Sequence, residues 1–360
     1  MKVVVIGGTG FIGKYVAKAF IRDPNTSIAL AARNPKLDQL QNLGNQILPP
    51  IKMDITSPSE VTGACKGANT VINLVGIMHE KPPKYTFKAV QHEGARNVAI
   101  AARENDAALV HVSAIGADPK SDIPYARTKG LGESSVRQEY PSAAIIRPSL
   151  VFGPEDDFFN RFAKLARLLP FMPVFGGGTT KFQPIYVWDL ADAIFKAATD
   201  PKYRGKVIEA GGPTVYTYRE IIQLTLDQAG IKRPIVSMPW SVGLLQGFFL
   251  EKLPLNLFTI TRDQVKLLQK DNIVDTNSNV LTLKDLGIKS PREAEKILHQ
   301  YLRNYDAVTP NKRTHRPVEK SVEDEIAEIE RIRRKTPKKA IEIEAEMLKK
   351  QKEHDAQTKK

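Results

Sequence analysis

The first 150 residues alternate short apolar runs with longer segments of mixed polarity. Five short runs are largely apolar and rich in Val, Ile, Leu and Ala: 2–7, 27–33, 69–76, 108–113 and 143–149. Three segments between them place apolar residues at helical spacing: 11–23, 85–105 and 124–140. Apolar runs of this kind are typical of parallel strands whose two faces are both covered by helices. The pattern predicts an α/β fold with a doubly wound parallel sheet.

The pattern loosens after residue 150. Pro and Gly interrupt residues 151–307, where helices are predicted at 189–200 and 217–230. We expect residues 1–150 to form one domain and residues 151–307 a small C-terminal lobe that binds a substrate or partner. This lobe should be interleaved with the last strands of the sheet. Residues 308–360 are highly charged and predict a helical or partly disordered tail.

Charge changes the picture only slightly. The formal net charge of the 360 residues is +13, of which +4 falls in residues 311–360. A basic body can attract nucleotide phosphates, anionic lipid or nucleic acid, and charge alone does not choose among them. The aromatic and basic pattern of an RNA-binding surface is absent, so we expect no nucleic-acid partner.

Cysteine and histidine usage excludes two kinds of site. A single cysteine, Cys65, cannot form an internal disulfide, and we expect it to be buried and unreactive. The six histidines lack the spacing of metal ligands, so we expect no metal site.

Residues 235–258 form the most apolar window of the sequence. Two prolines and two charged residues interrupt it, so it should not span a bilayer: Pro239, Glu251, Lys252 and Pro254. Its Trp240, Phe248 and Phe249 fit a membrane interface or a membrane subunit, and a buried core helix fits equally well. The chain begins with a strand and not with a secretory signal or presequence, which favours a bacterial protein or a chain numbered after processing.

The segment GGTGFIG, residues 7–13, lies between the first predicted strand and the first predicted helix. In such a turn Gly7 allows the tight bend, Gly10 lets a pyrophosphate approach the backbone, and Gly13 lets helix and strand pack closely. The helix N-terminus then offers free N–H groups to the anion. This arrangement predicts a Rossmann-type dinucleotide site, so the domain 1–150 should bind a nicotinamide cofactor.

The end of the second strand indicates which cofactor this is. An acidic residue there would bind the ribose hydroxyls of NAD, but the sequence has Arg33, whose guanidinium suits the 2′-phosphate of NADP(H). Asp54 and Ile55 follow a further, shorter strand between the runs 27–33 and 69–76, at a place where a side chain can border the adenine. The predicted cofactor-binding residues are Gly7, Thr9, Gly10, Phe11, Ile12, Gly13, Arg33, Asp54, Ile55, Leu74, Val75, Gly76, Tyr125, Lys129 and Pro148.

A catalytic set is also present. Ser113 ends the predicted strand 108–113, and Tyr125 and Lys129 lie one turn apart on the following helix. A nearby ammonium favours phenolate, so Lys129 should lower the pKa of Tyr125 and let it transfer a proton. Ser113 could position a carbonyl. The alternative is that Tyr125 and Lys129 only hold the nicotinamide ribose.

Several motifs together resemble one known family: GGTGFIG, NLVG, SAIGAD, YARTKGLGE, IIRPSLVFGPED and QPIYVWDLADAI. They are similar to the extended or atypical short-chain dehydrogenase/reductases. Residues 1–305 most resemble the NADPH-binding accessory subunits of respiratory complex I and their bacterial relatives. The resemblance implies an NADP(H) cofactor with a mainly structural role, and it carries over Arg33, Ser113, Tyr125 and Lys129.

The resemblance implies a place as well as a role. It leads us to expect complex I subunits as partners, a membrane-interface contact, and a position on the matrix side of the mitochondrial inner membrane or the cytoplasmic face of a bacterial one. Two alternatives stay open. The chain could be an active NADP-dependent reductase or epimerase acting on a carbonyl or quinone-pathway intermediate, or a sensor of the NADPH/NADP balance.

Overall fold

A computed structural model of the chain describes residues 1–35, 46–252, 254, 256–276 and 280–305. Met1–Ala307 form one compact unit and Val308–Lys360 a second. The predicted tail therefore lies outside the described residues. The division at residue 150 remains a prediction.

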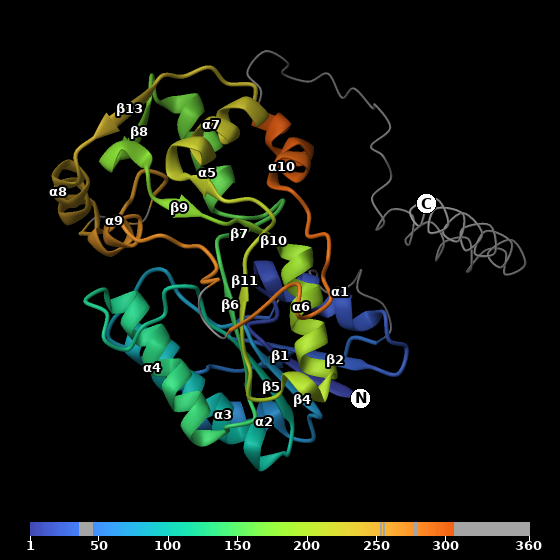
Figure 1. The fold of residues 1–360 in the computed structure, drawn as a ribbon. Helices are drawn as coiled ribbons and strands as arrows, with labels where there is room; N and C mark the ends of the chain where they lie inside the picture. The colour runs from blue at the N-terminus through green and yellow to red at the C-terminus, as the bar shows by residue number, and fades with distance from the viewer. Residues whose placement is uncertain (36–45, 253, 255, 277–279, 306–360) are drawn as a thin grey trace, which may run out of the picture. The chain divides into compact units, whose positions relative to one another are not determined.

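An eight-stranded sheet forms the centre of the first unit (Figure 1). Its strands are β1 Lys2–Ile6, β2 Ser27–Ala32, β3 Ile51–Lys52, β4 Thr70–Asn73, β5 Ala108–Val112, β6 Ala144–Pro148, β11 Val207–Ala210 and β14 Leu281–Thr282. Their order across the sheet is β14-β11-β6-β5-β4-β1-β2-β3, and all neighbouring pairs are parallel. The predicted parallel sheet is confirmed.

Helices cover both faces of this sheet. Helices α1 Phe11–Ile21 and α6 Val187–Thr199 lie on one face, and α2 Pro58–Cys65, α3 Gly94–Glu104 and α4 Pro124–Glu139 lie on the other (Figure 1). Successive residues of a strand point to opposite faces, so Val3 and Val5 join the core beneath α1 while Val4 joins the core beneath α3. The consecutive apolar positions of each strand are explained by these two cores.

The predicted helix 85–105 is only partly correct. Its first residues belong to a hairpin in which the backbone of Lys81 and Tyr85 exchange hydrogen bonds of 2.7 and 3.1 Å. Helical structure begins with the π-helix η2 Lys88–Glu93, which leads directly into α3. Tyr85 stays outside the helix because its N–H and C=O are already bonded to Lys81.

Residues beyond β6 build the small lobe and return twice to the sheet, as β11 and β14. The strands of the lobe pair two by two: β7 Val151–Phe152 with β10 Ile185–Tyr186, β8 Met172–Phe175 with β13 Ile235–Met238, and β9 Lys181–Phe182 with β12 Tyr216–Thr217. Its helices are α5 Phe158–Leu168, α7 Tyr218–Gln228, α8 Trp240–Leu250, α9 Arg262–Leu267 and α10 Ala294–Leu302. Short 3₁₀ segments are η3 Gly176–Gly178, η4 Pro201–Tyr203 and η5 Arg303–Tyr305. The predicted helix at 217–230 is α7, and the one at 189–200 is α6.

Asn272 joins the lobe to the ends of the sheet strands. Its N–H donates to Lys181 O at 2.8 Å, and its carbonyl accepts from Gln183 N at 3.1 Å. The Ser149 hydroxyl donates to the Asn272 side chain at 2.7 Å, and that side chain donates to Ile115 O at 3.3 Å. One half-buried asparagine therefore holds segments that follow β5 and β6 against the lobe strand β9.

Two smaller expectations can be compared with the structure. Cys65 is buried, and burial raises the pKa of its thiol to about 12, as expected for an unreactive cysteine. Among the described helices, none combines the length and apolarity needed to cross a membrane.

Candidate functional site

The glycine turn after β1 adopts the tight bend that the sequence predicts at Gly7. Gly7 has a φ of +80°, a conformation that favours glycine, and its N–H donates to Ala31 O of β2 at 2.8 Å. A side chain at Gly8 would lie 2.8 Å from Val5 O and from the Leu30 side chain. The turn is therefore packed tightly between β1 and β2, and Gly8 is a further required glycine that the spacing argument missed.

The other two glycines differ in what surrounds them. A Cβ at Gly13 would lie 2.3 Å from Gly8 O, so this glycine is required for α1 to pack on the turn. Among the described residues, a Cβ at Gly10 would meet only Gly7 O, in a tight contact of 3.2 Å, so Gly10 is less crowded than Gly13. No side chain caps α1 at Gly10, and the first N–H groups of a helix have no partner within it. This helix end fits the pyrophosphate of a dinucleotide.

Lys129 extends from α4 to the carboxyl ends of β4 and β5. Its ammonium donates to Val112 O, the last carbonyl of β5, at 3.3 Å. A Cβ at Gly76 would lie 3.1 Å from the Lys129 Nζ, so the glycine after β4 makes room for this ammonium. Lys129 is buried, and burial, partly offset by Glu133, lowers its pKa to about 8. The lysine is held where the two central strands end.

Tyr125 lies one turn earlier on α4, with its ring 6.0 Å from that of Phe87 in an edge-to-face contact. Burial raises the pKa of Tyr125 to about 12. The expectation that Lys129 would lower this pKa is wrong for the structure described. Desolvation disfavours the phenolate, while the ammonium is bonded to the Val112 carbonyl.

Ser113 follows Val112 directly, so it lies next to the carbonyl that binds Lys129. The Ser113 hydroxyl is buried and has no hydrogen-bond partner among the described residues. Buried hydroxyls are nearly always paired, so this oxygen is placed to bond a group that the protein itself does not supply. Of the three predicted catalytic residues, Ser113 and Lys129 are brought together through Val112, with Tyr125 on the same helix face as Lys129.

A buried imidazole beneath this site was not predicted. His111 of β5 accepts from the Asn73 amide at 3.1 Å, because the Asn73 carbonyl oxygen is occupied by Val75 N. Its Nε2 has no partner among the described residues. Burial, followed by the charge of Lys129, lowers the pKa of His111 to about 3, so the ring is neutral. The feature of the sequence that could have identified this residue is a histidine inside an otherwise apolar strand.

The remaining predicted contacts lie around the same strand ends. Arg33 is exposed after β2, and its guanidinium lies over the Tyr85 ring at 4.4 Å. Ile55 is in the core against Gly94, and Val75 packs beside Gly7. Pro148 is buried at the end of β6, where its carbonyl accepts from Ile115 N at 3.0 Å. Contact of Thr9, Phe11, Ile12 and Leu74 with a cofactor remains a prediction.

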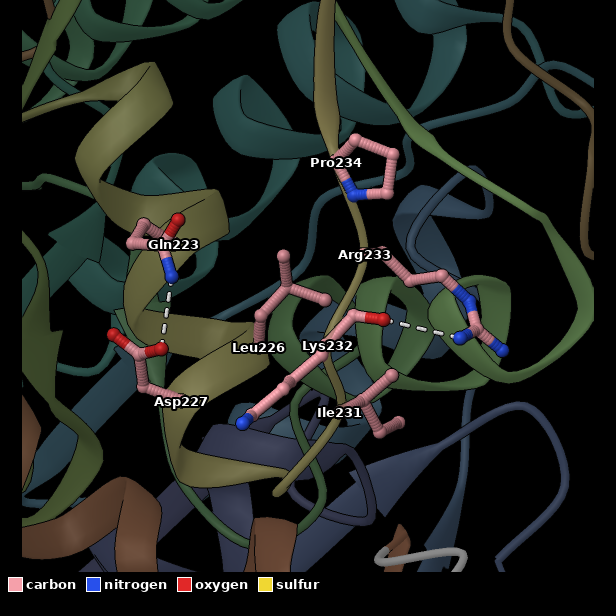
Figure 2. Close-up of a pocket in the computed structure, with 7 residues that line it drawn as sticks. All are labelled: Gln223, Leu226, Asp227, Ile231, Lys232, Arg233 and Pro234. Carbon is pink, nitrogen blue, oxygen red and sulfur yellow. Dashed lines mark hydrogen bonds between the residues drawn. The ribbon is translucent and has the colours of Figure 1, made fainter.

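A cavity in the small lobe lies apart from these residues. This cavity of about 310 Å³ is lined by the end of α7 and the segment leading to β13: Gln223, Leu226, Asp227, Ile231, Lys232, Arg233 and Pro234 (Figure 2). None of the predicted site residues lines it. Within the described residues there is no cluster of His, Cys, Asp and Glu that could hold a metal ion.

The strand order shows why the predicted residues meet. The chain moves from β1 outward to β2 and β3, then crosses to β4 on the other side of β1. Ligands of such sheets bind at the carboxyl ends of the strands where the order reverses. Gly7, Gly76 and Lys129 lie at that point.

A protein-family model described as "NAD dependent epimerase/dehydratase family" matches residues 3–211, more than half of the chain. The chain belongs to this family.

Similar proteins narrow the assignment. The chain is 30% identical to NADH dehydrogenase (ubiquinone) 1 alpha subcomplex subunit 9, mitochondrial, of Arabidopsis thaliana, over 85% of this chain and 78% of that protein. It is 28% identical to the protein of the same name from Dictyostelium discoideum, over 82% of each chain. A ceramide reductase of Caulobacter vibrioides is 28% identical over 66% of this chain and 73% of its own length. Within the family, the chain falls in the subunit 9 group.

Solved structures agree on the fold. The crystal structure of gox2253 has a TM-score of 0.64 at 20% identity, over 84% of this chain and 98% of that one. The dTDP-glucose 4,6-dehydratase of Bacillus anthracis, in complex with NAD, has a TM-score of 0.63 at 16% identity, over 85% of this chain and 96% of that one. Family membership supports a nicotinamide dinucleotide as the cofactor.

Proposed function

We propose that this chain is an accessory or assembly component of respiratory complex I, NADH:ubiquinone oxidoreductase, which binds NADP(H) mainly as a structural element. The observation that carries the proposal is the match to subunit 9 proteins over 85% of the chain, including both the sheet and the lobe. The glycine turn supports a bound dinucleotide. The partners would be subunits of the same complex.

NADP(H) rather than NAD(H) is proposed from the end of β2. Arg33 stands where an acidic residue would bind the ribose hydroxyls of NAD. Its guanidinium is exposed, and no described residue forms an ion pair with it. A planar cation with free N–H groups suits a phosphate.

Helix α8 supports a contact with the membrane interface. Only Gly243 and Gly247 of this helix are buried, and they pack against Phe175 and the start of α9. Leu245 and Phe249 are each 60% exposed. Lys252 lies at the end of the helix with its ammonium 4.0 Å from the Phe248 ring centroid. A largely apolar, exposed helix with a cation at its end fits an anionic lipid surface, on the matrix side in mitochondria or the cytoplasmic side in bacteria.

An active reductase is the second candidate, and Ser113 favours it. An unpaired buried hydroxyl beside Lys129 and Tyr125 is the arrangement that would receive a substrate carbonyl. A nicotinamide bound there would supply hydride. The residues of the chain would position the carbonyl through Ser113 and donate the proton through Tyr125.

The main proposal is tested with the tagged full chain purified from the membranes of its own organism. We expect NADP(H) to remain bound through purification, as measured by native mass spectrometry. We also expect the chain to co-migrate on native gels with NADH dehydrogenase activity. A soluble monomer with a freely exchanging cofactor would contradict the proposal, and release of NAD(H) alone would contradict only the choice of coenzyme.

A further inference from the structure

The segment between β4 and η2 folds back as a tight hairpin beside the end of β2. The backbone of Lys81 pairs with that of Tyr85, so Lys84 is the last residue of the turn and Tyr85 the first residue after it. This hairpin was not foreseen from the sequence, where residues 85–105 read as one helix. It brings the loop after β4 to the predicted 2′-phosphate residue, Arg33.

Asp54 fixes the hairpin in place. Its carboxylate accepts from the Tyr85 hydroxyl at 3.0 Å and pairs with the Lys84 ammonium at 2.8 Å. Thr56 donates to the same carboxylate through its N–H at 3.0 Å and its hydroxyl at 2.8 Å. Burial by itself would raise the pKa of Asp54, but these bonds outweigh it and lower the pKa to about 2. The anchor is therefore ionised at neutral pH.

The hairpin in turn orients Arg33. The guanidinium carbon is 4.4 Å from the Tyr85 ring centroid, and the Lys84 ammonium is 5.5 Å from the same centroid. Stacking occupies one face of the guanidinium and leaves the N–H groups at its edge available. Both cations therefore lie close to one ring, while the Asp54 carboxylate is already bound by Lys84 and Tyr85. A second carboxylate, that of Glu60, accepts from the Asp54 N–H at 2.9 Å.

We infer that the hairpin of residues 81–85 is a specificity element for a ribose 2′-phosphate, in which Tyr85 positions Arg33 and Lys84 offsets the negative charge of Asp54. The inference rests on the proposed NADP(H) function and names residues of that site outside the glycine turn and Arg33. An acidic residue in an NAD site binds the ribose hydroxyls, whereas Asp54 binds side chains of the hairpin. It holds Lys84 and Tyr85 of the hairpin and is itself neutralised by Lys84, so that it repels a phosphate less.

The experiment is calorimetry of the full-length, cofactor-stripped protein with four probes: NADPH, NADH, adenosine 2′,5′-bisphosphate and 5′-AMP. Tyr85→Leu removes both the stack and the bond to Asp54, whereas Tyr85→Phe keeps the stack. We expect Tyr85→Leu to weaken the two 2′-phosphorylated probes by about tenfold, the scale of one lost cation–π contact. Tyr85→Phe should weaken them by less, and the probes without a 2′-phosphate should change by less than about twofold.

Lys84→Met gives an independent measurement, because Lys84 is exposed and its loss should not unfold the protein. It should reduce the affinity for adenosine 2′,5′-bisphosphate and the salt dependence of that binding. Equal weakening of phosphorylated and unphosphorylated probes, or no weakening in Tyr85→Leu and Lys84→Met, would overturn the inference. If the unaltered protein binds neither NADPH nor NADH, the proposed function itself fails, and that result is distinct from a lost preference.

Discussion

At the residue scale, the glycines of the first turn have separable roles. Gly10 adopts an extended backbone with φ −79° and ψ 178°, which any residue can adopt, and a Cβ there would meet one described atom, Gly7 O, at 3.2 Å. Gly13 is in direct contact with the turn. A methyl group should therefore have different consequences at the two positions.

We expect Gly10→Ala to leave the unfolding temperature of the cofactor-free protein nearly unchanged and to lower dinucleotide affinity by about tenfold, since the methyl occupies the approach of the pyrophosphate. Gly13→Ala should destabilise the cofactor-free protein by about 1–3 kcal/mol through overpacking against Gly8. Thermal unfolding without and with coenzyme measures both. Identical behaviour of the two variants would show that Gly10 has only a structural role.

Residues of the candidate site could be predicted from the sequence where they lie close together along the chain. Gly7, Gly10 and Gly13 lie within one turn, and Tyr125 and Lys129 within another, so their spacing was enough. The contact of Arg33 with Tyr85 joins segments on different strands and needs a hairpin whose backbone pairing leaves no periodic signal. The pKa of Tyr125 was predicted in the wrong direction because burial, which spacing does not report, outweighs the nearby lysine.

At the element scale, α4 places the candidate catalytic groups. Gly130 and Gly132 of this helix allow it to lie close to its neighbours, since a Cβ on either would lie 2.3 Å from a backbone atom of Pro119 or Gln91. This close packing brings Lys129 to the ends of β4 and β5. The same helix carries Tyr125 near its start and ends before Tyr140.

Tyr125→Phe separates the two roles considered for the pair. If the chain is a reductase, the change should lower turnover of a carbonyl substrate by about 10²–10⁴-fold, the usual contribution of a general acid, with NADPH affinity nearly intact. Tyr140→Phe, at the other end of α4, is the matched control and should have no effect. A protein that reduces no compound in a broad carbonyl panel would exclude the reductase and leave the cofactor with a structural role.

Elements were predicted well where their periodicity was strong. The strands β1, β2, β4, β5 and β6 and the helices α1, α4, α6 and α7 were all recognised. Helices α5 and α10 were not, because their apolar residues pack against one another within the lobe and are preceded by Pro- and Gly-containing turns. For residues 235–258 the sequence left two alternatives, and the exposure of Leu245 and Phe249 removes the buried core helix.

At the scale of the whole molecule, helix α8 forms the surface that we propose contacts the membrane. We expect Leu245→Glu with Phe249→Glu to lower binding to vesicles of anionic lipid by about tenfold or more, because each exposed side chain would lose an apolar burial of roughly 1–3 kcal/mol. Vesicle co-sedimentation measures this.

Leu168→Glu on α5 is the control, since Leu168 is 63% exposed and lies on a different helix of the lobe. An equal effect of the control would indicate a general loss of apolar surface, and no effect of the double variant would remove the membrane contact from the proposal.

The sheet order has a consequence for synthesis on the ribosome. The strands of the predicted dinucleotide site, from β1 to β6, are complete once residue 148 has emerged. Strand β11 adds to the outer edge of β6 only after residue 210, and β14 adds to the outer edge of β11 only after residue 282. Domains generally fold from the N-terminus as they are made. The nascent chain therefore carries the predicted coenzyme site beside an unpaired edge of β6 while residues 149–210 are made, and early binding of the nucleotide would protect this incomplete sheet.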